Sequence, residues 1–502
     1  MSNLARPLLW TPVMPKAARS LVVLLMSMTA CFRVGEPLAG SAAPAVVDEA
    51  AVAGPSVEEP AARLARLQSE LAVDQAEAFV ADEPVEIPSA ESESTEAPPA
   101  EPMRPVIDTV EVLVHTTVRA EPRRDATALG MVSMGGRVDV HERVRAPGCR
   151  GTWLAIAPRG FVCTKTRATR RSAHGILPEV PDYAGVPGVY GSVAKEALVY
   201  GSLAAAAAQE DGRAPGRHLT VRREKSAAVG GRRFWKTRYG WVRGDDVRRL
   251  EGTRFHGEML DDGLAQPLAW TLPAPSQKRV DVLSEPLADA EVLTQLPARR
   301  PRPVLAERDG FVQVEEGWIA LERVRVARRT EAPQGVGDER WLDIDLSEQV
   351  LVAYEGATPV YATLISSGKP GHRTPTGVFR ISRKVAERTM NSMADSSDSY
   401  SVDKVPWTAY FAHGYALHAA FWHGGFGRTR SHGCVNLAPR DARALYDWMS
   451  PLAAPGWSEV YGHEDQLGSV VRLRSDRSPE PEWKGYAKEL LDTDTVRVAR
   501  AG

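Results

Sequence analysis

The sequence predicts a mainly β protein that ends in a larger, sandwich-like or barrel-like β domain with one short helix. From residue 106 onward, short apolar stretches alternate with polar residues and end at glycine, a pattern typical of half-buried strands. The stretch 441–448, just after Pro439, is expected to form the helix. With 502 residues, the chain has room for about three domains at roughly 150 residues each.

The overall charge gives no reason to expect a nucleic-acid partner. The chain has 62 basic and 64 acidic side chains and a formal net charge of -2, whereas nucleic-acid binding proteins usually carry a basic excess. No segment supplies the roughly 20 continuous apolar residues that a transmembrane helix needs. Composition therefore favours a globular protein outside the nucleic-acid binding class.

The first 30 residues have the pattern of a secretory signal peptide. Lys16 and Arg19 precede the apolar run 21–30, which ends in small residues; Met14 would be a more typical start than Met1. Cys31 follows directly, and this order resembles a bacterial lipobox, which implies lipidation of Cys31 and a membrane anchor. An ordinary signal peptide with cleavage nearby is the alternative.

Residues 31–105 are expected to form a disordered, lipid-anchored linker. They are rich in Ala, Pro, Glu and Ser and cannot bury enough apolar surface to fold. Such a tether has a root-mean-square reach of about 50 Å. We therefore expect a cell-envelope protein on the periplasmic side. Phe32, which follows the expected lipidation site, favours the outer membrane over the inner one.

Three smaller β modules are predicted, at 106–172, 190–252 and 276–330. Each contains a glycine-aromatic-aliphatic ending, at 160–162, 240–242 and 317–319, which marks them as repeats. The first resembles the bacterial Src-homology-3-like domain, and the other two resemble it more weakly. The resemblance implies binding of cell-wall glycan or peptide. The alternative for Trp153, Trp235 and Trp318, and the one we expect, is a place in the module cores.

The four cysteines divide into different expected roles. Cys149 and Cys163 fall in the first module, and in an oxidising compartment they could form a disulfide. With Cys31 acylated and that pair joined, Cys434 is the one thiol left over. A leftover thiol in an exported protein is a candidate nucleophile.

The last domain is expected to span 339–475. The stretch 341–346 alternates cleanly, and 350–354 and 359–366 continue it as a β-hairpin and a third strand; 469–473 is expected to close the sheet. Between 384 and 405 the chain is polar and lacks a strand period, so we expect a lid over a substrate groove or an ordinary mobile loop. The tail 476–502 is charged and uninformative.

One motif carries most of the chemistry. His418 lies thirteen residues before Ser431-His432-Gly433-Cys434-Val435-Asn436. A nearby imidazole can deprotonate a thiol, and the thiolate is the form that attacks a carbonyl carbon. Four of the eleven histidines, His413, His418, His423 and His432, fall within twenty residues of one another. Zinc is an alternative for such a cluster, but no recognised zinc spacing is present.

The motif resembles the signature of the L,D-transpeptidases of the YkuD family, and the likeness extends over the whole domain, including residues 368–377. It implies a cysteine acyltransferase without metal or cofactor. In this resemblance Cys434 is the nucleophile and His418 the base, oriented by the backbone carbonyl of Ala419. Glycine is usual at position 419, so this chain departs from the pattern there. His423 is the alternative base.

The resemblance assigns supporting roles to the rest of the motif. His432 is expected to act with Cys434 and His418 as a catalytic residue, and Ser431 to orient the loop or the substrate. Backbone N–H groups around Gly433 are expected to bind the oxyanion. Asn436 would fix either the substrate amide or only the loop. Trp422 would line the substrate groove, with core packing as the alternative.

The expected activity is the cross-linking of peptidoglycan stem peptides. Cys434 would attack the carbonyl between the third residue and D-alanine of a tetrapeptide stem, and the amine of a second stem would take the acyl group. Water as acceptor would make the protein an L,D-carboxypeptidase. Two rivals are a non-catalytic wall-binding lipoprotein and, more distantly, a zinc peptidase. Carbapenem-type inhibitors are expected to acylate Cys434.

Overall fold

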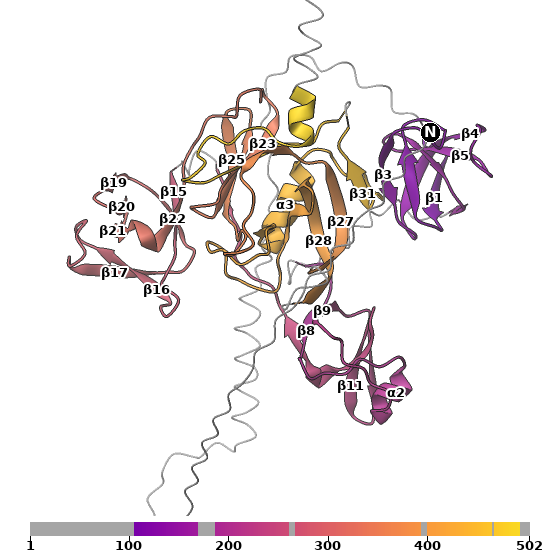
Figure 1. Cartoon of the computed structure of the whole chain (residues 1–502), viewed down its shortest axis with the longest axis horizontal. Coiled ribbons are helices and arrows are strands. Elements are labelled where there is room, and N and C mark those ends of the chain that lie inside the picture. The colour runs from indigo at the N-terminus through magenta and orange to yellow at the C-terminus, as the bar shows by residue number, and fades with distance from the viewer. Residues whose placement is uncertain (1–104, 169–185, 261–266, 393–398, 464–465, 492–502) are drawn as a thin grey trace, which may run out of the picture. The chain divides into compact units, whose positions relative to one another are not determined.

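The computed structural model describes residues 105–168, 186–260, 267–392, 399–463 and 466–491 (Figure 1). The expected signal peptide, the lipidation site at Cys31 and the linker as far as residue 104 lie outside these ranges. Strands dominate the described residues, which confirms the mainly β fold class. No helix among the described residues is both long and apolar enough to cross a membrane.

The first module is a set of seven short strands around a valine-rich core. Val112, Val118 and Val140 are fully buried, as their alternation with polar residues predicts. Trp153 is buried in this module, and a disulfide joins Cys149 to Cys163. The strands are β1 (Asp108–Val112), β2 (Thr116–Arg119), β3 (Ala128–Val132), β4 (Arg137–Val144), β5 (Trp153–Ile156), β6 (Phe161–Cys163) and β7 (Thr166–Ala168).

The second module combines six strands with a short helix. Trp235 is 9% exposed and packs with Leu219, Val221 and Val242. Ser202 caps the helix by accepting from the Ala205 N–H. The elements are β8 (Tyr190–Val193), α2 (Leu203–Ala208), β9 (His218–Arg222), β10 (Lys225–Val229), β11 (Arg232–Thr237), β12 (Gly240–Arg243), the 3-10 turn η1 (Gly244–Asp246) and β13 (Val247–Leu250).

The third module includes one strand that precedes its expected start. Strand β15 pairs with β22, although it begins eight residues before position 276. Trp318 is half-buried beneath the Arg308 guanidinium rather than enclosed in the core. The elements are β15 (Leu268–Thr271), β16 (Arg279–Leu283), β17 (Val292–Pro297), β18 (Pro301–Pro303), β19 (Ala306–Arg308), β20 (Phe311–Val314), β21 (Gly317–Ala320), η2 (Leu321–Arg323) and β22 (Val324–Ala327).

The last domain begins with a six-stranded sheet. Its order is β14-β25-β24-β23-β32-β26, and β23 and β32 are parallel although about 130 residues separate them in the chain. The predicted strands at 341–346, 350–354, 359–366 and 469–473 all fall in this sheet. The bounds are β14 (Glu258–Met259), β23 (Arg340–Asp345), β24 (Val350–Glu355), β25 (Thr358–Leu364), β26 (Gly377–Arg380) and β32 (Val470–Arg474).

A second group of strands carries the motif residues. Strand β28 pairs with β27 on one side and β29 on the other, and β30 lies parallel to β29. Strand β31 pairs with β27 and with β3 of the first module, and β28 pairs in parallel with β9 of the second. The bounds are β27 (Arg383–Asn391), β28 (Tyr400–Ala412), β29 (Tyr415–Ala419), β30 (Val435–Leu437) and β31 (Glu459–Tyr461).

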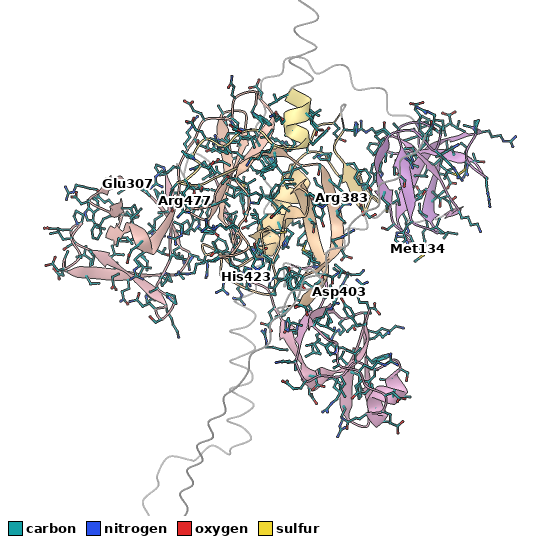
Figure 2. The ribbon with its side chains drawn as sticks, in the orientation of Figure 1. Met134, Glu307, Arg383, Asp403, His423 and Arg477 are labelled. Atoms are coloured by element: carbon teal, nitrogen blue, oxygen red, sulfur yellow. A yellow bond between two sulfur atoms is a disulfide. The ribbon has the colours of Figure 1, made fainter. Side chains whose placement is uncertain are left out.

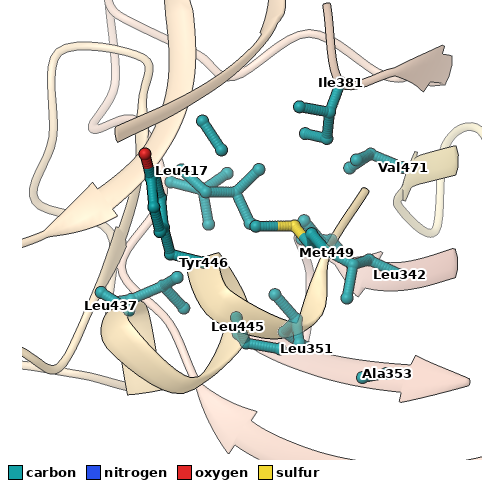
Figure 3. Close-up of a cluster of buried hydrophobic side chains, with 14 of the residues drawn as sticks. Leu342, Leu351, Ala353, Ile381, Leu417, Leu437, Leu445, Tyr446, Met449 and Val471 are labelled. Carbon is teal, nitrogen blue, oxygen red and sulfur yellow. The ribbon is translucent and has the colours of Figure 1, made fainter. Parts of the chain in front are cut away.

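The core of this domain forms around helix α3 (Pro439–Trp448), which contains the predicted helix and begins with its proline at the first turn. Leu445 and Met449 are buried with Leu342 and Val471 of the first sheet and Leu417 of β29 (Figure 3). Side chains of both sheets thus meet in one core, which fixes β29 and β30 in place.

One expectation for this domain was wrong, and one uninformative segment proved to be structured. The polar stretch 384–405 is not one long irregular loop, because β27 and β28 form a hairpin that reaches Asn391 and Ser401, with only 393–398 outside the described residues. The tail is also structured as far as residue 491. Trp483 donates from Nε1 to the Gln334 carbonyl at 3.1 Å and packs against the guanidinium of Arg380. The hairpin depends on pairing between neighbouring segments, and the tail depends on partners more than 100 residues away.

Candidate active site

Strand pairing places the two central motif residues on the same side of a sheet. In the parallel pair β29 and β30, Leu417 faces Val435 and His418 faces Asn436. Side chains alternate along a strand, so Cys434 and Asn436 project to one face, and the paired His418 projects to that face too. Cys434 is therefore one strand away from His418, at a diagonal position.

The tautomer of His418 follows from one hydrogen bond. Its Nδ1 lies 3.0 Å from the carbonyl oxygen of Ala419, which can only accept. Nδ1 therefore carries the proton and Nε2 is left as a free base. Burial lowers the pKa of His418 to about 4, partly offset by the Ala419 bond, so the imidazole is neutral at pH 7. Replacing the usual glycine by Ala419 leaves this backbone contact intact.

Cys434 is the one free cysteine among the described residues, and it is partly exposed. Its sulfur lies 3.8 Å from the Gly414 carbonyl oxygen in the turn between β28 and β29. Burial raises the pKa of the thiol, and a backbone hydrogen bond with Ala416 offsets part of that rise. The thiol and the His418 imidazole are thus both neutral at rest, so the thiol has to lose its proton when the sulfur attacks.

The loop before Cys434 is held by a set of short polar contacts. Ser431 Oγ donates to the Cys434 carbonyl at 2.5 Å and accepts from the Gly433 N–H at 3.0 Å. Thr374 Oγ1 donates to the Gly433 carbonyl at 2.8 Å. Gly433 has φ +121°, and a Cβ there would stand 2.7 Å from the Tyr415 ring. Only glycine combines this backbone conformation with the space available.

The Gly433 amide, one of those expected at the oxyanion site, has a partner inside the loop. The Gly433 N–H donates to Ser431 Oγ and is not available to a substrate. The N–H of Asn436 donates to the Ser366 carbonyl oxygen. At rest the Gly433 amide is therefore bonded within its own loop. The sequence could not reveal this, because a serine hydroxyl can turn either toward the loop or away from it.

His432 lies on the exposed side of the loop. Its ring centroid is 4.6 Å from the ring of His372 and 5.0 Å from that of Tyr400. It therefore borders the segment 368–374 and the hairpin β27–β28, while His418 lies on the buried side. His413 is exposed in the turn after β28. The four clustered histidines thus do not converge on one point.

The remaining motif residues form a second polar group. The carboxamide of Asn436 is 3.0 Å from His423 Nε2, and the Gly425 N–H donates to His423 Nδ1 at 3.2 Å. Trp422 is half-buried, with its ring 5.8 Å from that of His418. Both ring nitrogens of His423 are thus engaged away from Cys434, which argues against His423 as the base.

Sequence reasoning missed Tyr400 and Thr374. Burial raises the pKa of the Tyr400 phenol and a negative charge on Cys434 would raise it further, so this tyrosine of β28 lies near the thiol. An aromatic residue at the end of the polar stretch 384–405 could have indicated it. Thr374 gave no signal, because threonine is common in turns. Among the described residues, no three His, Cys, Asp or Glu side chains converge as a metal site would require.

Comparison with known proteins assigns the last domain to a family. Residues 339–471 match the model of the L,D-transpeptidase catalytic domain, YkuD. No curated protein matches the chain. The family model matches the last domain only, so the modules upstream are not assigned by it.

Three solved structures illustrate the likeness. A cysteine-to-serine variant of the Enterococcus faecium L,D-transpeptidase is 22% identical, over 30% of this chain and 54% of that one, with TM-score 0.22. An L,D-transpeptidase from Mycobacterium smegmatis is 18% identical, over 45% and 89%, with TM-score 0.23. An L,D-transpeptidase in complex with imipenem is 16% identical, over 49% and 98%, with TM-score 0.23. The assignment rests on the family model, since these scores are low.

Proposed function

We propose that the protein is a peptidoglycan L,D-transpeptidase that works through a thioester on Cys434. The observation that carries the proposal is the tautomer of His418: its Nδ1–H is committed to Ala419, so Nε2 presents a lone pair on the face from which Cys434 projects. A thiol that is neutral at rest needs such a base. The match of residues 339–471 to the catalytic domain supports the same reaction class.

The reaction consists of two acyl transfers. His418 Nε2 takes the thiol proton as Cys434 Sγ attacks the carbonyl between the third residue and D-alanine of a tetrapeptide stem. The tetrahedral oxyanion is bound by the Cys434 N–H, and the C–N bond breaks as the imidazolium returns the proton to D-alanine. The amine of a second stem then attacks the thioester, loses its proton to His418 and releases the thiol.

Product analysis tests this assignment. Purified protein is incubated with disaccharide-tetrapeptide, and the products are separated and weighed. Cross-linked dimers are expected, and Cys434→Ala should give none. Tripeptide alone would make the protein an L,D-carboxypeptidase. Unchanged tetrapeptide from folded protein would contradict both activities.

The wall-binding lipoprotein is tested separately. Sacculi are incubated with the full chain and with a truncation that ends at Pro333. Binding by the truncation, together with wild-type behaviour of Cys434→Ala in cells, would favour that rival. A zinc peptidase would lose its activity to chelators and keep it after iodoacetamide treatment; we expect the reverse.

The regions outside the catalytic domain complete the proposal. We infer that the three modules are Src-homology-3-like and bind wall glycan or peptide. We also infer that the chain is exported and anchored in the periplasm through a lipid on Cys31, in the outer membrane rather than the inner one. Metabolic labelling with a fatty acid should mark wild type and not Cys31→Ala.

A further inference from the structure

The hydrogen bonds of His423 determine which of its ring nitrogens is protonated. The Gly425 N–H donates to Nδ1 at 3.2 Å, so Nδ1 is an acceptor and carries no proton. Burial lowers the pKa of His423 to about 4, and the positive charge of Arg430 lowers it further. The ring is therefore neutral at pH 7, and a neutral imidazole with a bare Nδ1 has its proton on Nε2.

The direction of the Gly425 N–H is fixed by the fold. The carbonyl oxygen of the same residue accepts from Ser366 Oγ at 3.2 Å. Ser366 in turn exchanges two backbone hydrogen bonds with Asn436. A Cβ at Gly425 would stand 1.9 Å from Nε of Arg430, so the loop is closely packed against that side chain. The glycine-rich loop around His423 (Figure 2) thus cannot turn its N–H away without losing these contacts.

The Asn436 carboxamide places its N–H₂ group against the protonated Nε2 of His423, so that two donors face each other. Its nitrogen faces His423 Nε2 at 3.0 Å, while its Oδ1 is buried without a partner among the described residues. Two N–H groups cannot bond to each other, and the oxygen and nitrogen of a carboxamide are assigned from their hydrogen bonds. Turning the amide by 180° about its terminal bond exchanges Oδ1 and Nδ2. His423 Nε2–H then donates to Asn436 Oδ1, and both of these atoms have a hydrogen-bond partner.

The turned carboxamide changes what the site offers to a substrate. The N–H₂ group takes the buried position at which Oδ1 met no hydrogen-bond donor among the described residues, so no donor there competes for a substrate acceptor. Asn436 is 3% exposed and is paired with His418 across the parallel strands, so this group lies on the catalytic face. A buried donor without an acceptor is costly, and a carbonyl oxygen removes that cost.

We propose that His423 is a positioning residue that holds the Asn436 carboxamide so that its N–H₂ group donates to a peptide carbonyl oxygen of the donor stem. This step rests on the proposed function, because it takes the stem peptide as the substrate. It makes Asn436 a substrate-binding residue and separates His423 from the proton transfer, which belongs to His418.

The tautomer can be measured without any substrate. The full chain is labelled with ¹⁵N-histidine, and long-range ¹H–¹⁵N correlation spectra are recorded at pH 7, with His423 assigned by its loss in His423→Gln. A neutral ring protonated on Nε2 is expected. A ring protonated on Nδ1, or a cation, would overturn the inference whatever the enzyme does.

The positioning role is tested by replacing His423 with amide side chains of two different lengths. The glutamine amide extends about as far as Nε2 and can still donate, whereas the asparagine amide extends only as far as Nδ1. We expect His423→Gln to keep kcat/KM for stem acylation within about threefold of wild type. His423→Asn and Asn436→Ala should each lose about tenfold to a hundredfold, as for one buried hydrogen bond. His115→Gln, in an exposed position of the first module, is the matched control.

A double-mutant cycle separates positioning from a general loss of structure. Because His423 acts through Asn436, the double variant His423→Asn/Asn436→Ala should be no slower than Asn436→Ala alone. The positioning role would be overturned if the losses of kcat/KM in His423→Asn and Asn436→Ala multiplied in the double variant. It would also be overturned if His423→Gln and His423→Asn lost equal amounts of kcat/KM. His423→Gln should also keep the acid limb of the wild-type pH profile, because it is not the base. If wild type acylates no stem, the proposed function fails while the tautomer result stands.

Discussion

The hydroxyl of Thr374 donates to the carbonyl oxygen of Gly433 over 2.8 Å and accepts from the Gly368 N–H over 2.9 Å. One buried side chain thereby joins the segment 368–377 to the residue before Cys434. Thr374→Val keeps the shape and removes both bonds. We expect acylation to slow by about tenfold, the effect of one or two buried hydrogen bonds.

The control for this prediction is Thr429→Val, at an exposed position of the same region. Acylation is followed as the loss of free thiol during reaction with a carbapenem. Equal rates for Thr374→Val and Thr429→Val would show that the Gly433 carbonyl needs no side-chain anchor.

Gly433→Ala should inactivate the enzyme. A Cβ would stand 2.7 Å from the Tyr415 ring, and φ +121° is a conformation that L residues rarely adopt. Gly371→Ala separates these causes, because φ is +85° there and a Cβ would meet nothing within 4 Å. We expect Gly371→Ala to lose about 1 kcal/mol of unfolding free energy and to keep its activity. Denaturant melts and acylation rates of both variants check this, and an active Gly433→Ala would contradict it.

The decrease of acylation activity in acid should occur at an unusually low pH. Burial lowers the pKa of His418 from 6.5 to about 4, and only the neutral imidazole accepts the thiol proton. Activity is therefore retained as the pH falls through 6.5 and is lost as it falls through about 4. The measurement is kcat/KM for acylation between pH 3.5 and 8, on protein shown to be folded at each pH. A half-point near 6.5 would mean that the imidazole is solvated.

Lys384 should make stability depend on pH in alkaline solution. It is fully buried on β27 and donates to the carbonyl oxygens of Tyr446, in the last turn of α3, and Met449, directly after the helix. Burial lowers its pKa from 10.5 to about 7. Between these values the unfolded chain binds more protons than the folded one, so the free energy of unfolding rises with pH.

Lys384→Met removes the contribution of this amine to the pH dependence of the unfolding free energy. Relative to the variant, wild type should gain on the order of 1 kcal/mol per pH unit between about pH 7 and 9. Urea melts of both proteins at these pH values give the comparison, since the other titrating groups are shared. A constant difference between the two would show that Lys384 keeps an ordinary pKa in the folded protein.

Carbapenems should acylate Cys434, because the thiolate opens the lactam as it would attack a stem carbonyl. Intact mass of wild type after incubation should show one adduct, and Cys434→Ser should show none on the same time scale. A missing adduct on wild type, or equal labelling of Cys434→Ser, would reject the prediction.

The hydrogen bonds around Asp343 illustrate what local pattern cannot predict. Its strand alternates apolar and acidic residues, which predicts one solvent-exposed face of the sheet, yet the Asp343 residue is 1% exposed. Arg472 donates to it at 2.7 Å and Arg474 at 3.0 Å, both from the parallel strand β32. The acidic face is buried because its arginine partners come from more than 120 residues away.

The sequence by itself determined the mainly β class, the strands of the last domain, its helix and the spacing of the motif from His418 to Cys434. These features depend on short-range periodicity and spacing, which the chain carries locally. Only the tertiary structure decided that Ser431 Oγ accepts from the Gly433 N–H, that Tyr400 lies near Cys434 and that His423 bonds to Asn436. Those choices depend on which of several possible partners a polar group meets, and strand pairing between distant segments fixes that.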